Sequence, residues 1–129
     1  MSGRRILVVE DNPLNLKLVR DVLTASGYDV VEAGTGEDGV SLALEAAPDL
    51  VLMDLQLPGI DGYEALRLIR EDPRLGALPV VALTAFAMRE DRERTARAGF
   101  DGYLSKPISV RDLPAQVGDF LGNGRHDAR

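Results

Sequence analysis

The chain has 129 residues, which suits one domain with a single core and is too short for two. It contains no cysteine, which excludes disulfides and thiol nucleophiles, and its net charge of -6 disfavours nucleic acid, because binding a phosphate backbone needs clustered Lys and Arg. No apolar run reaches membrane-spanning length and no signal-peptide core is recognisable. We therefore expect a cytoplasmic protein that does not bind membranes.

Short apolar runs alternate with amphipathic segments along the chain, which predicts five strands and five helices in strict alternation. Asn12 and Pro13 suit the N-cap and the first residue of the first helix, and Gly27 suits its end. In chain order, the predicted elements are strand 6–9, helix 13–26, strand 28–33, helix 37–47, strand 50–54, helix 62–73, strand 80–84, helix 88–98, strand 100–105 and helix 110–121.

This alternation predicts an α/β fold, a five-stranded parallel sheet with five helices on both faces and right-handed connections. The apolar run at residues 50–53 does not alternate with polar residues, as expected for a strand covered on both faces. We expect one domain over residues 1–121 and a flexible C-terminal tail over residues 122–129. The only histidine, His126, lies in that tail and is not expected to be catalytic.

Polar side chains lie at the ends of four predicted strands. Glu10 and Asp11 follow the first strand, Asp54 ends the third, Thr84 ends the fourth, and Lys106 follows the fifth. The carboxyl ends of parallel strands open into a crevice where ligands bind. If the strand order is 2-1-3-4-5, the first and third strands are neighbours, and the three acids meet in one crevice.

Three carboxylates so close together would raise one another's pKa unless a cation offsets their charge. Oxygen ligands without cysteine or a nearby histidine favour a hard ion, Mg²⁺ above others and Mn²⁺ as an alternative. Lys106 adds a positive charge from the other side. We predict that Asp54 is a carboxylate nucleophile that accepts a phosphoryl group, while Thr84 and Lys106 hold the remaining phosphoryl oxygens.

The motifs that contain these residues resemble those of the receiver domains of bacterial two-component response regulators, over about residues 4 to 121. The start of the chain is similar to stand-alone receivers of the cell-division-regulator type and to receivers attached to hybrid kinases. The resemblance implies the flavodoxin-like strand order 2-1-3-4-5. The matching motifs are Ile-Leu-Val-Val-Glu10-Asp11-Asn12, Leu-Met-Asp54-Leu-Gln-Leu-Pro58-Gly59-Ile-Asp61-Gly62, Leu-Thr84-Ala85 and Lys106-Pro107.

The resemblance implies a role for each acidic residue. Asp54 would take the phosphoryl group from a histidine kinase or a histidine phosphotransfer protein. Asp11 and Asp54 would bind Mg²⁺ directly, together with the backbone carbonyl of Gln56, and Glu10 would contribute mainly through water. Such a domain is a signalling module and not an enzyme, with at most slow self-dephosphorylation.

The resemblance also implies a conformational switch. Thr84, Ala85 and Lys106 would contact the phosphoryl group, and the Lys106–Pro107 peptide bond would be cis. Tyr103 matches the aromatic residue that turns inward when Thr84 moves toward the phosphoryl group, although a half-buried strand residue explains it as well. The fourth helix, fifth strand and fifth helix would then present a changed surface to a downstream protein target.

The first helix has more apolar residues than one packed face needs. Leu14 and Leu18 are candidates for a docking patch that receives the helical domain of a kinase, next to Asp54. The simpler interpretation, in which both leucines are core or singly exposed residues, has equal weight.

Two other functions compete with the phosphoacceptor hypothesis. Gly34-x-Gly36-x-x-Gly39 follows a predicted strand and opens a helix, as in dinucleotide-binding modules, but acidic residues at positions 37 and 38 would repel a pyrophosphate. A phosphatase with an aspartyl intermediate would need a general acid at position 56, where Gln56 cannot transfer protons.

Overall fold

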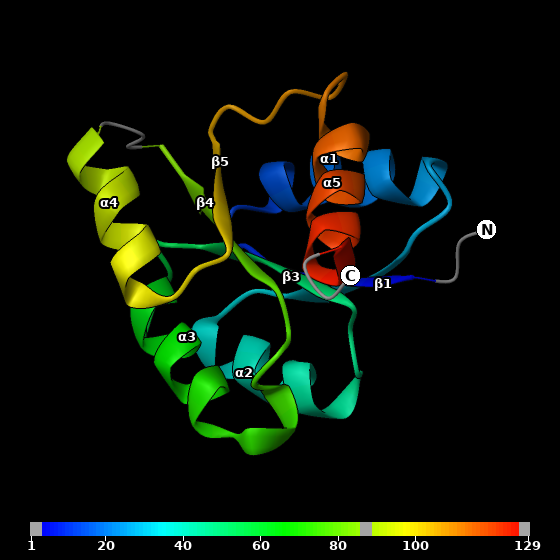
Figure 1. Ribbon diagram of the computed structural model, residues 1–129. Coiled ribbons are helices and arrows are strands. Elements are labelled where there is room, and N and C mark those ends of the chain that lie inside the picture. Colours follow the sequence, from blue (N-terminus) through cyan, green and yellow to red (C-terminus); the bar gives the residue numbers. More distant parts are fainter. Residues whose placement is uncertain (1–3, 86–88, 127–129) are drawn as a thin grey trace.

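The strands of one parallel sheet lie between two layers of helices (Figure 1). The structure is a computed structural model that describes residues 4–85 and 89–126. Its strands are β1 (Arg5–Val9), β2 (Asp29–Ala33), β3 (Leu50–Asp54), β4 (Val80–Thr84) and β5 (Gly102–Ser105). Its helices are α1 (Pro13–Ala25), α2 (Gly36–Glu45), α3 (Gly62–Glu71), the 3-10 helix η1 (Pro73–Leu75), α4 (Arg89–Ala98) and α5 (Leu113–His126).

The strand order is β2-β1-β3-β4-β5 and every pairing is parallel, which confirms the predicted α/β architecture and its flavodoxin-like order. All side chains of β3 and β4 are buried, as their unbroken apolar runs indicate. The register pairs Val9 with Met53, so that β1 and β3 end side by side. The polar residues that follow these strands are therefore brought to one edge of the sheet.

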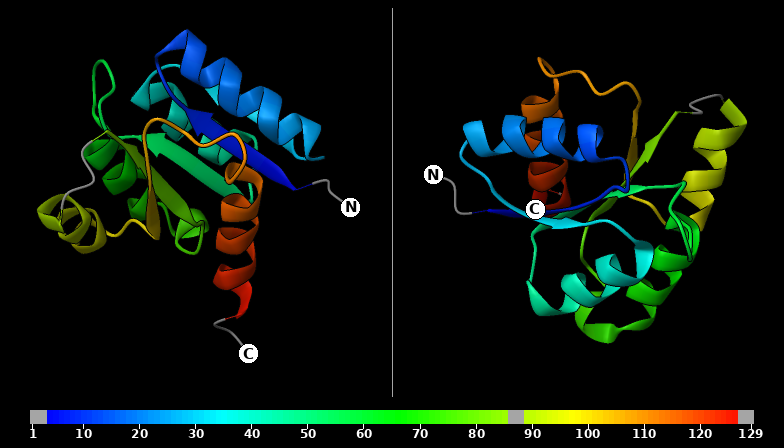
Figure 2. Two further views of the ribbon diagram at one scale, coloured as in Figure 1. Left: turned by 90° about the horizontal axis from the view of Figure 1, so that it is seen from above. Right: turned by 180° about the vertical axis from the view of Figure 1, so that it is seen from behind.

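Two apolar clusters hold the helices on the sheet. Val19 and Leu23 of α1 and Leu113 and Val117 of α5 pack on one face. The other face is covered by α2 and α3, and the views from the front and from behind show the same two layers (Figure 1; Figure 2). Among the described residues, every helix falls short of the length and apolar character that a membrane span requires.

The helix starts follow from capping residues that the sequence shows directly. The side-chain oxygen of Asn12 accepts hydrogen bonds from the backbone N–H of Leu14 at 2.9 Å and of Asn15 at 3.2 Å, ahead of Pro13 in the first turn. Gly27, with φ of 96°, follows the end of α1. The predicted start and end of this helix are thus correct to within a residue.

Other predicted ends differ from the structure. β5 begins at Gly102 and not at residue 100, and η1 was not predicted. α2 ends at Glu45, before Ala47 adopts a φ of 49°. α5 begins at Leu113 and not at residue 110, although the hydroxyl of Ser109 accepts a hydrogen bond from the backbone N–H of Asp112 at 3.2 Å, the contact expected of a cap at position 109.

The expected end of α5 at residue 121 was wrong, because the helix continues to His126. Packing of its apolar face outweighs the low helix propensity of the glycines that follow. Leu121 belongs to the buried cluster and is the last residue of α5 in it, among the side chains that the structure describes. A flexible tail stays a prediction, since residues 127–129 lie outside the described residues. The predicted start of α4 at Met88 also lies outside them.

Candidate functional site

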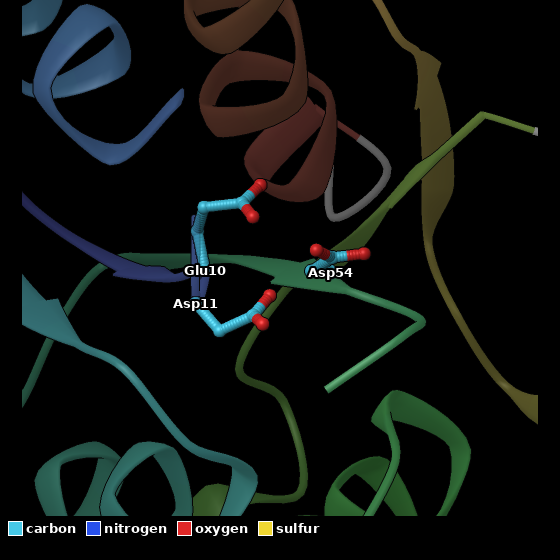
Figure 3. Close-up of side chains that lie close together, drawn as sticks. All are labelled: Glu10, Asp11 and Asp54. Atoms are coloured by element: carbon cyan, nitrogen blue, oxygen red, sulfur yellow. The ribbon is translucent and has the colours of Figure 1, made fainter. Parts of the chain in front are cut away.

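Three carboxylates converge where β1 and β3 end. Glu10 and Asp54 are almost completely buried, with 1% and 4% of their surface exposed, whereas Asp11 is exposed. One oxygen atom from each of the three lies within 4.8 Å of the others. Figure 3 shows the side chains of Glu10 and Asp11 extending from the end of β1 toward the region where Asp54 ends β3. The predicted meeting of the three acids is present.

Backbone N–H groups orient the two buried acids. The amide of Asn12 donates to Glu10 Oε2 at 3.1 Å, and the amide of Gln56 donates to Asp54 Oδ1 at 3.0 Å. Glu10 itself extends the β1 ladder, because its N–H donates to the carbonyl of Ala33 at 3.0 Å. Through the amides of Asn12 and Gln56, each carboxylate is held by the loop that follows its own strand.

Lys106 neutralises part of this charge from the end of β5. Its Nζ lies 2.9 Å from Glu10 Oε1 and 2.9 Å from Asp54 Oδ2. The backbone N–H of Lys106 donates to the carbonyl of Thr84 at 2.8 Å, which ties the end of β5 to the end of β4. The Lys106–Pro107 peptide bond is cis, the isomer that the sequence resemblance implied.

Burial and charge act in opposite directions on these groups. Burial raises the pKa of the Glu10 carboxyl, and the hydrogen bond from Lys106 offsets only part of this effect. Burial alone would lower the pKa of the Lys106 ammonium, but its hydrogen bonds to Asp54 and Glu10 outweigh it and raise that pKa. The lysine is therefore a fixed positive charge at this site.

The remaining predicted residues lie around the acids. Thr84 is buried at the end of β4 beside Ser105, and Ala85 is exposed directly after it. Gln56 is exposed in the loop that follows β3. Tyr103 is half-buried in β5, one of the two edge strands of the sheet.

One close approach at the site was not anticipated. A Cβ atom on Gly62, the first residue of α3, would lie 2.5 Å from the backbone oxygen of Asp54 and 2.8 Å from Cα of Leu55. The N–H of Gly62 also donates to the carbonyl of Leu55 at 3.0 Å. The pair Asp61-Gly62 reads in the sequence as a helix start, which it is, but only the structure shows that α3 supports the backbone of Asp54.

The glycines of the competing dinucleotide motif serve packing. A Cβ atom on Gly36 would lie 2.6 Å from the side chain of Ile60, and one on Gly39 would lie 2.8 Å from the side chain of Val9. The carboxylate of Glu37 accepts a hydrogen bond from the backbone N–H of Ile60 at 3.3 Å. Close helix packing explains these residues, and a dinucleotide site is not supported.

The family model for the response regulator receiver domain matches residues 6–118. The chain belongs to this family. It is therefore a signalling domain of two-component regulation, and its cluster of three acids is compatible with a bound Mg²⁺ and a phosphoacceptor aspartate.

Individual relatives agree with this assignment. The receiver is 43% identical over 120 residues to the polar-differentiation response regulator DivK of Brucella ovis, a match that covers 93% of this chain and 98% of that protein. The receiver domain of the sensor histidine kinase PA1611 from Pseudomonas aeruginosa, solved with a magnesium ion coordinated in its active site cleft, has a TM-score of 0.85, 38% identity and coverage of 93% and 98%. A CheY-like receiver domain protein from Methanospirillum hungatei has a TM-score of 0.85, 28% identity and coverage of 97% and 98%.

The two leucines proposed for docking differ from their neighbours in this receiver. Leu14 is 77% exposed. Leu18 is half-buried and lies outside both apolar clusters of the described residues, whereas Leu16 and Val22 pack against one of them. The leucines at positions 14 and 18 therefore contribute little to the core.

Proposed function

We propose that this receiver accepts a phosphoryl group on Asp54 from a histidine kinase or a histidine phosphotransfer protein. The observation that carries the proposal is the environment of the Asp54 carboxylate. It is buried, its two oxygens are oriented by the N–H of Gln56 and by Lys106, and it lies close to two further acids. Such an arrangement orients a carboxylate for attack instead of leaving it solvated at a strand end.

In the proposed transfer, a carboxylate oxygen of Asp54 forms a bond to phosphorus while the bond between phosphorus and the donor imidazole nitrogen breaks. The electron pair of the broken bond stays on that nitrogen, and the product is an acyl phosphate. Lys106 Nζ, already 2.9 Å from Asp54, would offset charge on the phosphoryl oxygens. Thr84 would contact another of these oxygens, with Ala85 next to it.

The donor set at the site fits a hard divalent cation. Asp11 and Asp54 would hold Mg²⁺ through their carboxylates and Gln56 through its backbone carbonyl, while Glu10 would act through water. A bound Mg²⁺ supplies positive charge that offsets the carboxylates and the incoming phosphoryl oxygens. Mn²⁺ takes similar oxygen ligands and is expected to substitute for it.

Replacing Asp11 by Asn should weaken Mg²⁺ binding by about tenfold or more, since even residues that only support a metal ligand contribute about 10- to 100-fold. Isothermal titration with magnesium chloride measures this directly. Asp119→Asn, at an exposed position of α5, is the matched control and should leave the affinity unchanged. Equal affinities for Asp11→Asn and the wild-type chain would remove Asp11 from the metal site.

Intact-mass analysis after incubation with acetyl phosphate tests the proposed function itself. With magnesium chloride present, the chain should gain the mass of one phosphoryl group, and an excess of EDTA should suppress the gain. Absence of any gain with magnesium present would contradict the proposal.

We further propose that the acyl phosphate changes the surface formed by α4, β5 and α5. Thr84 would move toward the phosphoryl group and Tyr103 would turn inward, so that a downstream protein binds the altered surface. We also propose that the receiver acts in the cytoplasm.

Leu14 and Leu18 are proposed to dock the helical domain of the phosphodonor protein. Replacing Leu18 by Glu should slow phosphotransfer from a phosphorylated histidine kinase by about tenfold, the effect of losing roughly 1.4 kcal/mol of binding free energy. The melting temperature should stay nearly the same, because Leu18 lies outside the apolar clusters. Transfer from acetyl phosphate needs no docking and should keep its wild-type rate. A large drop in melting temperature would instead identify Leu18 as a core residue.

A further inference from the structure

Helix α4 is attached to the domain differently from the other helices. Thr95 is its one buried residue in the described chain, and most of its other side chains are charged and exposed. Two of its arginines contact tyrosines on two different neighbouring elements. Arginine–tyrosine contacts thus replace much of the apolar packing that would normally hold a helix in place.

The first contact joins α4 to α3. The guanidinium carbon of Arg94 lies 4.4 Å from the centre of the Tyr63 ring. That ring packs edge-on against Phe100, with ring centres 5.7 Å apart and an angle of 79° between the planes. Since Phe100 is part of the buried core, Tyr63 is a rigid platform for Arg94.

The second contact joins α4 to β5. Arg92 Nη1 donates a hydrogen bond to the hydroxyl of Tyr103 at 3.2 Å, and its guanidinium carbon lies 5.9 Å from the centre of the ring. This contact is exposed, and Tyr103 is only half-buried. In contrast to Tyr63, Tyr103 can leave its arginine without disturbing a buried aromatic pair.

We propose that Arg92 is a positioning residue that holds Tyr103 toward the surface and favours the resting state, while the stack of Arg94 on Tyr63 keeps α4 attached in both states. The inference rests on the proposed function, in which Tyr103 turns inward after phosphorylation. An inward ring takes its hydroxyl away from Arg92, so this contact exists in one state only.

A contact made in one state shifts a two-state equilibrium by its whole contribution, whereas a contact made in both shifts nothing. Cation–π contacts at exposed sites change equilibria by about two- to fivefold. Loss of the Arg92 contact should therefore raise the population of the phosphoryl-competent state by about that factor. Loss of the Arg94 stack should lower stability and leave the population nearly unchanged.

Fluorine NMR of the chain labelled with 3-fluorotyrosine tests the proposal, because the sequence has only three tyrosines, at positions 28, 63 and 103. Beryllofluoride with magnesium serves as the phosphoryl probe. In Arg92→Met, the free protein should show the Tyr103 resonance displaced toward its position in the wild-type complex. The apparent dissociation constant for beryllofluoride should fall by about two- to fivefold. The Tyr28 resonance provides an internal reference.

Three matched variants separate positioning from a general effect on α4. Arg92→Lys keeps the positive charge and should restore most of the wild-type behaviour. Arg97→Met removes an exposed arginine in the last turn of the same helix and should leave the Tyr103 resonance and the beryllofluoride affinity unchanged. Arg94→Met should lower the melting temperature while its beryllofluoride affinity stays within about twofold of wild type.

A wild-type Tyr103 resonance and unchanged affinity in Arg92→Met would overturn the role of Arg92. An equal affinity gain in Arg94→Met would overturn the division between the two arginines. Failure of the proposed function gives a different result, since the wild-type chain would then show no beryllofluoride response. A wild-type response that disappears in Asp54→Asn supports the proposed function whatever the outcome for Arg92.

Discussion

Replacing Asp54 by Asn is expected to abolish phosphoryl incorporation completely. An amide cannot form the acyl phosphate, yet Asn has nearly the same size, and its oxygen can still accept the hydrogen bond from the N–H of Gln56. Lys106 keeps its contact with Glu10, so the domain should remain folded. Incubation with acetyl phosphate and magnesium chloride, followed by intact-mass analysis, should show no gain in the variant.

Asp61→Asn is the matched control for this experiment. Asp61 is an exposed acid in the loop between β3 and α3. It caps α3 by accepting a hydrogen bond from the N–H of Glu64 at 2.9 Å, a role that Asn fills equally well. This variant should gain the same mass as the wild-type chain. A phosphoryl group that persists in Asp54→Asn would place the acceptor at another residue.

Replacing Gly62 by Ala should destabilise the domain by about 3 kcal/mol, in the upper range for overpacked substitutions. The new Cβ would meet the backbone oxygen of Asp54 at 2.5 Å and Cα of Leu55 at 2.8 Å. These atoms cannot yield easily, because the N–H of Leu55 donates to the carbonyl of Leu83 at 3.1 Å and continues the pairing of β3 with β4. Urea unfolding measures the change in the free energy of unfolding.

Gly34→Ala is the control, since a Cβ there would meet no atom within 4 Å. Its free energy of unfolding should change by less than about 1 kcal/mol. The Gly62→Ala variant should also accept phosphoryl groups more slowly, because the new Cβ pushes against the backbone of Asp54 and displaces its carboxylate. Equal stability of the two variants would mean that α3 moves away from β3 without cost.

The strands and the polar residues at their ends could be predicted from the sequence. The burial of β3 follows from an unbroken apolar run, and the meeting of Asp11 with Asp54 follows once β1 and β3 are neighbours. The strand order came from the family resemblance and is confirmed. The acidic cluster could therefore be predicted from the residue types at the strand ends together with that strand order.

Contacts that depend on three-dimensional packing could not be found in this way. The stack of Arg94 on Tyr63 joins residues far apart in the chain, and a run of charged residues reads only as a solvated helix. The continuation of α5 past Gly122 is not indicated by its sequence, because glycines at positions 122 and 124 have low helix propensity. The apolar pattern of α1 also could not separate Leu18, outside the apolar clusters, from Leu16, which packs against one.

The single ammonium of Lys106 serves two acids that belong to different strands. A movement of this nitrogen toward an anion added on Asp54 also changes its contact with Glu10, because both contacts use the same atom. Glu10 is almost fully enclosed and has little access to solvent that could compensate. A change at the Asp54 carboxylate is thereby transmitted to the Glu10 carboxylate through Lys106. The end of β1 is in this way coupled to the end of the central strand β3.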